Sequence, residues 1–164
     1  MAEPDIFGLA QRTRFFRLKN KKREPIIMEK RPFVGVAVIV IKNQKVLLGK
    51  RKNSHGSGTW QFPGGHLEFN ESIKDCARRE LFEETGIKIK NIRLGPYTND
   101  IFEKEKKHYI TLFVVADYDS GVLELKEPEK CEKWDWFEWG KLPEPSFLPI
   151  KNLMASQKVP FTAL

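Results

Sequence analysis

The sequence predicts an α/β fold in which a mixed β-sheet packs against a small number of helices. Several short apolar segments have the length and the β-branched content of strands, whereas only two segments have the pattern of helices. No internal repeat or low-complexity tract interrupts this order. The chain has 164 residues, of which 40% are hydrophobic, so we expect one domain of ordinary globular composition.

The predicted strands lie before and after the main helix. The β-branched segment 34–41 and the apolar segment 45–48 are separated by three polar residues, which indicates a β-hairpin. A polar loop at 51–58 leads toward Pro63-Gly64-Gly65, which predicts a tight turn. The other predicted strands are 60–62, 89–97, 109–117 and 134–139.

The main helix is predicted over Asn70–Thr85. Asn70 can cap its start, no Pro or Gly interrupts it, and Gly86 can end it. A second, shorter helix is expected near Ile150–Ser156, after a segment that is broken up by prolines.

Acidic side chains lie on the face of the main helix that should be buried. At 100° per residue, Ala77 and Leu81 belong to one apolar stripe. Glu80 and Glu84 fall in the middle of this stripe, and Glu83 lies at its edge. Because an uncompensated buried carboxylate costs on the order of several kcal/mol, the pattern predicts a bound cation.

The residue types indicate which cation this would be. Carboxylate ligands without His or Cys favour Mg²⁺, for which Mn²⁺ can substitute. Arg79 could pair with one of the three acids but not with all of them. Gly64 and Gly65 precede the helix and could offer carbonyls to a metal or N–H groups to phosphate. The alternatives are a solvated acidic face and a plain turn.

The net charge of +7 is concentrated at the start of the chain. Residues 1–31 hold nine Lys or Arg and four acids, so residues 32–164 carry only +2. We therefore divide the chain into a basic N-terminal extension, residues 1–32, and a folded domain, residues 33–164. The extension reads as a solvated tail, an organelle-targeting segment, or a contact surface for nucleic acid or acidic lipid. For the domain itself, no stable nucleic-acid partner is expected.

Location is predicted from what the sequence lacks. The first residues do not read as a secretory signal, and the longest apolar run, 34–41, is too short to span a membrane. Cys76 and Cys131 stand alone, which argues against a disulfide framework or a zinc site. We expect a cytoplasmic protein without a membrane partner, with mitochondrial or other organellar targeting by residues 1–31 as the alternative.

Residues 65–87 match the Nudix box, G-x5-E-x7-R-E-U-x-E-E-x-G-U, at every specified position. The chain thus resembles the Nudix hydrolase superfamily, and within it the small MutT-related pyrophosphohydrolases of plants and animals. The closer resemblance rests on residues 63–69 and on Glu127–Glu132. The matching box residues are Gly65, Glu71, Arg79, Glu80, Leu81, Glu83, Glu84, Gly86 and Ile87.

The resemblance implies an α/β/α sandwich with a central mixed sheet and a catalytic loop-helix-loop. It implies Mg²⁺-dependent cleavage of nucleoside triphosphates, either dGTP-like or oxidised purine nucleotides such as 8-oxo-dGTP, to monophosphate and pyrophosphate, as in nucleotide sanitisation. The alternatives are dihydroneopterin triphosphate, a nucleotide sugar, NADH or ADP-ribose, and a non-catalytic binding module. Relatives are commonly homodimers.

The resemblance also implies roles for individual residues. Glu80 and Glu84 would be metal ligands together with Glu83 and the Gly65 carbonyl, and Glu83 would alternatively act as the base. Glu71 and Arg79 would orient the helix, and Gly86 would end it. A further acid could come from Glu103 or Glu105. The expected substrate-binding residues are Arg51, Phe62, Gly64, Gly65, His66, Thr111 and Leu148. Aromatic residues that could either stack on a base or fill the core are Trp134, Trp136 and Trp139.

Overall fold

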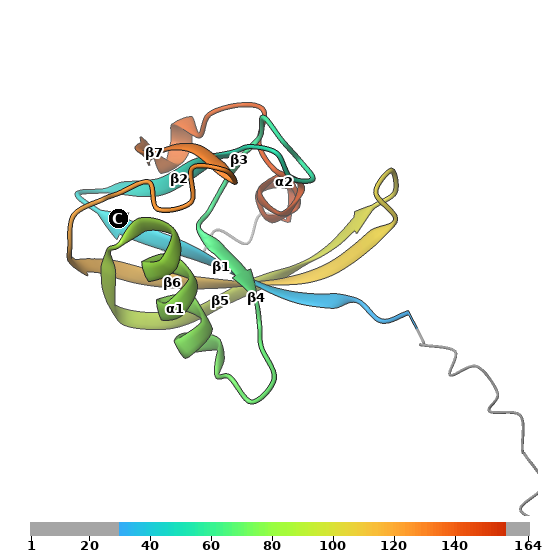
Figure 1. Ribbon diagram of the computed structural model, residues 1–164, viewed down its shortest axis with the longest axis horizontal. Helices are drawn as coiled ribbons and strands as arrows, with labels where there is room; N and C mark the ends of the chain where they lie inside the picture. Colours follow the sequence, from blue (N-terminus) through green and yellow to red (C-terminus); the bar gives the residue numbers. More distant parts are fainter. Residues whose placement is uncertain (1–29, 157–164) are drawn as a thin grey trace, which may run out of the picture. The chain divides into compact units, whose positions relative to one another are not determined.

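The computed structural model describes residues 30–156, so predictions for residues 1–29 and 157–164 lie outside the described part. Helix α1 (Ile73–Thr85) and helix α2 (Leu148–Ala155) pack against different core clusters on the central sheet (Figure 1). The predicted α/β/α sandwich is confirmed. The strands are β1 (Phe33–Lys42), β2 (Lys45–Arg51), β3 (Trp60–Gln61), β4 (Gly64–His66), β5 (Lys88–Phe102), β6 (Lys107–Ser120) and β7 (Cys131–Glu138).

The sheet is mixed, as expected. The strand order is β3-β2-β1-β6-β5, with β4 on β1 and β7 on β2. Strand β1 runs parallel to β6 and antiparallel to β2 and β4. Along its other edge β1 changes partner, because Gly35–Ala37 pair with β4 whereas Ile41 and Lys42 pair with β2. Strands β4 and β2 therefore lie one after the other along the same edge of β1.

Side chains of β1 alternate between two cores. Val36, Val38 and Val40 belong to a cluster that also contains Leu81 of α1. Ile39 belongs to a second cluster on the other face, next to α2. Because helices cover both faces, β1 reads as a continuous apolar run instead of an alternating one.

Helix α1 starts later than predicted. Ser72, not Asn70, is the N-cap: its hydroxyl accepts from the Asp75 N–H at 3.2 Å. Asn70 instead adopts φ 64° in the preceding turn. The predicted end is correct, since Gly86 has φ 73° and its N–H donates to the Phe82 carbonyl at 2.9 Å.

The Gly-Gly segment is not the tight turn that we predicted. Gly64–His66 form the short strand β4, which pairs with β1. Gly64 has φ 145°, and a Cβ there would collide with the Val36 carbonyl. The missing side chain therefore serves a close approach between two strands instead of a reversal of the chain.

Other boundaries differ by a few residues. Strand β5 continues to Phe102, because its pairing with β6 extends to the base of the hairpin loop. Strand β7 begins at Cys131, and a 3₁₀ turn, η1 (Trp139–Lys141), follows it. Helix α2 begins at Leu148, with a proline in its first turn. Within residues 30–156, no helix is both long and apolar enough to cross a membrane.

Candidate active site

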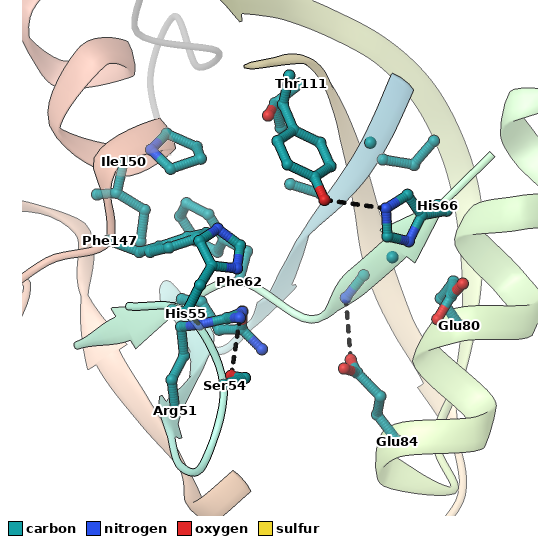
Figure 2. Close-up of a pocket in the computed structure, with 18 of the residues that line it drawn as sticks. Arg51, Ser54, His55, Phe62, His66, Glu80, Glu84, Thr111, Phe147 and Ile150 are labelled. Carbon is teal, nitrogen blue, oxygen red and sulfur yellow. Dashed lines mark hydrogen bonds between the residues drawn. The ribbon is translucent and has the colours of Figure 1, made fainter. Parts of the chain in front are cut away.

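A cavity of about 380 Å³ is lined by residues of α1, of β4 and of the start of α2. Figure 2 shows its two ends: Glu80 and Glu84 project from α1 on one side, and aromatic side chains gather on the other. Glu127, from the loop before β7, lines it as well. The rings that line the aromatic end are His55, Phe62, Phe102, Tyr109 and Phe147.

The acidic end is built by the close approach of β4 to α1. The Gly64 N–H donates to Glu84 Oε2 at 2.9 Å. A Cβ on Gly65 would lie only 2.5 Å from Glu80 Oε2, so the glycine leaves room for this carboxylate. Gly64 and Gly65 thus lie directly against Glu84 and Glu80, although 20 and 15 residues separate them in the sequence.

Arg79 anchors the helix at this end. Its Nε and Nη2 donate to the two carboxylate oxygens of Glu71 at 2.7 and 2.9 Å. Its Nη1 lies 2.7 Å from Glu80 Oε1 and 3.4 Å from Glu83 Oε2. Arg79 therefore pairs with two of the three neighbouring box acids, which is more than we expected. The hydrogen bonds from Arg79 lower the pKa of Glu71 to about 2.

Glu84 has a different environment. Burial raises its pKa to about 8, and the nearby carboxylates of Glu80 and Glu127 act in the same direction. The Gly64 N–H and the positive charge of Arg51 oppose this shift only in part. An ionised Glu84 would therefore be stabilised by a cation at this position.

The residue types at the acidic end fit a hard divalent metal. Glu80, Glu84 and the Gly65 carbonyl offer oxygen ligands only, as Mg²⁺ and Mn²⁺ prefer. Within residues 30–156, no three His, Cys, Asp or Glu side chains already converge as a metal-binding group. In this arrangement Glu80 and Glu83 bind Arg79, while Glu84 binds Gly64. Glu80 meets Arg79 through Oε1, which leaves Oε2 to face a metal ion.

Glu83 does not line the cavity. Its side chain is 55% exposed and turned toward Arg79, since it follows Glu80 by three residues on the outer side of α1. Glu103 and Glu105 do not line it either, because they lie exposed at the β5–β6 hairpin tip. Glu127 occupies the cavity instead. The pairing of β7 with β2 brings its loop there, and single-sequence reasoning had no signal for that pairing.

Arg51 stands between the two ends. Its Nε donates to the His55 carbonyl at 2.9 Å, and its Nη2 donates to Ser54 Oγ at 3.0 Å. The guanidinium lies 4.3 Å from the centre of the Phe147 ring. Burial lowers its pKa, but arginine remains charged at any physiological pH. Arg51 thus presents a fixed positive charge close to Glu84.

The structure brings most of the expected substrate-binding residues to the cavity. Phe62 is buried in its wall, and His66 bonds to the Tyr109 hydroxyl at 3.1 Å. Thr111 also lines it. Leu148 is not among the lining residues, whereas its neighbours Phe147 and Pro149 are, so its contact with substrate stays a prediction.

Of the two roles expected for the tryptophans, stacking on a base or filling the core, the structure shows the second. Trp134 and Trp136 pack against the core under α1, and Trp139 packs against the core under α2. None of the three lines the cavity. His55, which belongs to no motif of the sequence, does line it. Its ring contacts Phe102 at 4.6 Å and Phe147 at 5.1 Å between centroids.

Comparison with known proteins gives a consistent picture. The chain matches the family described as NUDIX domain over residues 31–157. It is 30% identical over 145 residues to an ADP-ribose pyrophosphatase of Methanocaldococcus jannaschii, covering 87% of this chain and 82% of that protein. It is 29% identical to an oxidized purine nucleoside triphosphate hydrolase of Danio rerio, covering 65% of this chain and 66% of that enzyme.

The same fold is found in solved structures. The MutT NUDIX hydrolase of Burkholderia pseudomallei superimposes with a TM-score of 0.72 at 28% identity. The match covers 79% of this chain and 99% of that one.

Proposed function

This chain belongs to the Nudix hydrolase family, and we propose that it cleaves nucleoside triphosphates to monophosphate and pyrophosphate. At the coarser level, it is a pyrophosphohydrolase that acts on nucleotide-linked substrates. The proposed substrate is a purine nucleotide, either dGTP-like or oxidised, such as 8-oxo-dGTP. A nucleotide sanitisation role would follow from the oxidised substrate.

One observation carries this proposal: a single cavity joins an acidic end to an aromatic end. The aromatic end suits the flat ring of a nucleobase, and the acidic end suits a metal-bound phosphate chain. The volume of about 380 Å³ is at the small end of the range for ligand sites, roughly 300–1,000 Å³. It therefore favours one nucleoside over a dinucleotide.

Nudix hydrolases generally use divalent metal ions. Glu80, Glu84 and the Gly65 carbonyl would hold Mg²⁺, or Mn²⁺ in its place. When bound, the metal neutralises phosphate charge and polarises the bond that breaks. Glu83, expected in this set or as the base, lies outside the cavity, so we place it outside the first ligands.

The protein's own residues bind and orient the substrate. Arg51 and Lys130 line the cavity and would hold the phosphate oxygens. Glu127 would take the proton of the attacking water, and its ion pair with Lys130 at 2.8 Å keeps it at the acidic end. Phe62 and Phe147 would pack against the base.

A second substrate class has a specific observation in its favour. The Methanocaldococcus jannaschii relative, which covers most of this chain, is named an ADP-ribose pyrophosphatase. The same acidic end would cleave the diphosphate of ADP-ribose, giving AMP and ribose 5-phosphate. Dihydroneopterin triphosphate, nucleotide sugars and NADH remain further candidates, and intact Glu80 and Glu84 argue against a non-catalytic module.

The test is hydrolysis of a nucleotide panel in Mg²⁺, followed by chromatography of the products. We expect pyrophosphate and a monophosphate from a purine triphosphate, and no product with Glu84→Gln. If only ADP-ribose or a nucleotide sugar is cleaved, the triphosphate proposal is wrong and the second class is correct.

Three further proposals concern the whole protein. We place the domain at residues 33–164, with residues 1–32 as a basic extension, and we propose a cytoplasmic location. We also propose a homodimer, because the edge strand β5 exposes Leu94, Tyr97 and Ile101. Light scattering after gel filtration would contradict the dimer if it gave a mass near 19.1 kDa.

A further inference from the structure

Behind the cavity lies a buried acid for which the proposed reaction has no use. Asp100 of β5 has no exposed surface. Its Oδ2 accepts from the hydroxyls of Thr98 and Thr111 at 2.9 and 2.5 Å, and its Oδ1 accepts from Asn152 Nδ2 at 2.7 Å. All three donors are neutral. A carboxylate is costly to bury, so its retention calls for a physical reason.

The contact with Thr111 links this acid to the cavity, because Thr111 is one of the lining residues (Figure 2). Its hydroxyl oxygen faces the space above Gly35, which also lines the cavity. A Cβ built on Gly35 would be 3.9 Å from Thr111 Oγ1 and 3.8 Å from the Tyr109 ring. The hydroxyl therefore borders the floor of the cavity.

The Thr111 hydroxyl donates to Asp100 Oδ2, and a hydroxyl has a single proton. The proton of Thr111 is therefore committed to Asp100. On its cavity side the Thr111 hydroxyl therefore presents a lone pair of its oxygen, which can accept a hydrogen bond.

We propose that Asp100 is a positioning residue that makes Thr111 a hydrogen-bond acceptor, so that the cavity selects a substrate ring carrying an N–H donor. This inference rests on the proposed function, since it assumes a nucleotide in this cavity. It adds a chemical criterion for the base: a base with an amino group or a ring N–H at this position is favoured over a base that has only a hydrogen-bond acceptor there.

Asn152 makes the inference testable. Asp100→Asn replaces one oxygen by an NH₂ group, which cannot face Asn152 Nδ2 because both are donors. Asn152 is itself held in orientation by a bond to the Asn99 carbonyl at 3.4 Å. The new NH₂ group therefore faces Thr98 and Thr111, whose hydroxyls rotate to accept. The proton of Thr111 then turns to the cavity.

The double variant Asp100→Asn with Asn152→Asp should restore the original polarity. The carboxylate introduced at position 152 can only accept, so it draws the NH₂ group introduced at position 100 toward itself. The amide oxygen at position 100 then faces Thr98 and Thr111, as the carboxylate oxygen does in the parent protein. Their hydroxyl protons return to it, and Thr111 again presents an acceptor to the cavity.

The experiment measures kcat/KM with Mg²⁺ for three nucleotide pairs: GTP and ITP, ATP and purine riboside triphosphate, 8-oxo-dGTP and dGTP. The first member of each pair carries one more donor group, which is an amino group in the first two pairs and a ring N–H in the third. In the parent protein we expect at least one pair to show a preference of about 3- to 10-fold for that member, the value of one neutral hydrogen bond.

The variants should change this ratio in different ways. Thr111→Val and Gly35→Ala should bring it to 1, the second because its methyl fits at ordinary contact distance yet covers the hydroxyl. Asp100→Asn should bring it to 1 or below, and the double variant should restore it. Thermal unfolding of each variant verifies folding, and Gly35→Ala leaves the Asp100 network intact.

Two results would overturn the inference alone: a ratio of 1 for every pair in an active parent protein, or an unchanged ratio in Thr111→Val and Gly35→Ala. If the parent protein hydrolyses none of the six nucleotides, the proposed function fails, and this inference fails with it.

Discussion

The acidic end and the aromatic end of the cavity are built in different ways. The acidic end comes mainly from one helix and one three-residue strand, held by Arg79 and by the Gly64 N–H. The aromatic end is assembled from the β2–β3 loop, the β5–β6 hairpin and the start of α2. A short continuous segment can therefore specify the chemistry, while several distant segments specify what is bound. Changes at the two ends should separate kcat from KM.

The largest effect is expected at the acidic end, within one helix. Glu84→Gln should lower kcat about 1,000-fold, because a lost metal ligand removes several kcal/mol of transition-state stabilisation. Glu83→Gln is the matched control. Since Glu83 lies outside the cavity, we expect a loss of less than about 10-fold. Steady-state kinetics with a purine triphosphate would measure both. Near-normal turnover of Glu84→Gln would refute its role as a ligand.

The next effect concerns the aromatic end. Phe147→Ala should raise KM about 10-fold and change kcat little, since an aromatic wall contributes roughly 1.5–3 kcal/mol to binding. Leu148→Ala is the adjacent control outside the cavity, and its KM should stay near that of the parent protein. Equal changes in the two variants would mean that the wall has been assigned to the wrong residue.

Glu71, just before α1, and Glu84, in its last turn, should contribute opposite pH dependences of stability in the metal-free protein. The pKa of Glu71 is lowered to about 2, so its stabilisation is full above pH 4.5 and is lost as pH falls toward 2. The pKa of Glu84 is raised to about 8, so stability is lost as pH rises from 4.5 through 8. Urea unfolding of each Glu→Gln variant against the parent protein measures both slopes.

Addition of Mg²⁺ should remove the loss at Glu84 but leave Glu71 unchanged. Slopes of the same sign would contradict the contrast between Glu71, which forms an ion pair with Arg79, and Glu84, which is buried and bonded to a backbone N–H.

The smallest effect is expected from the basic extension. Deletion of residues 1–31 should leave kcat and KM within about twofold, because the cavity is lined by residues between Gly35 and Ile150. The same assay applies. A collapse of activity would show that the extension belongs to the site.

These contrasts also explain what the sequence could predict. The order of the elements, α1 and the acidic face follow from local periodicity and from the fixed spacing of Gly65 to Gly86. The sequence predicts Asn70 as the cap, whereas the structure has Ser72; both residue types cap helices, and only the backbone conformation distinguishes them. Such boundaries depend on the tertiary structure.

The parts of the site that come from distant segments were less predictable, because they depend on strand pairing. Asp100 meets Thr111 only through the β5–β6 pairing, and Glu127 reaches the cavity only because β7 pairs with β2. Neither pairing has a signal in a single sequence. The sequence predicts Leu148 as a substrate contact, whereas Phe147 lines the cavity. Both residues lie in a proline-rich segment where no periodicity indicates the side-chain direction.

The central proposal is that a divalent cation sits between Glu80 and Glu84. Anomalous scattering from crystals soaked in Mn²⁺ tests it directly. We expect one or more strong peaks within about 2.5 Å of these carboxylate oxygens, with the Gly65 carbonyl nearby. Crystals that show no peak there would contradict it.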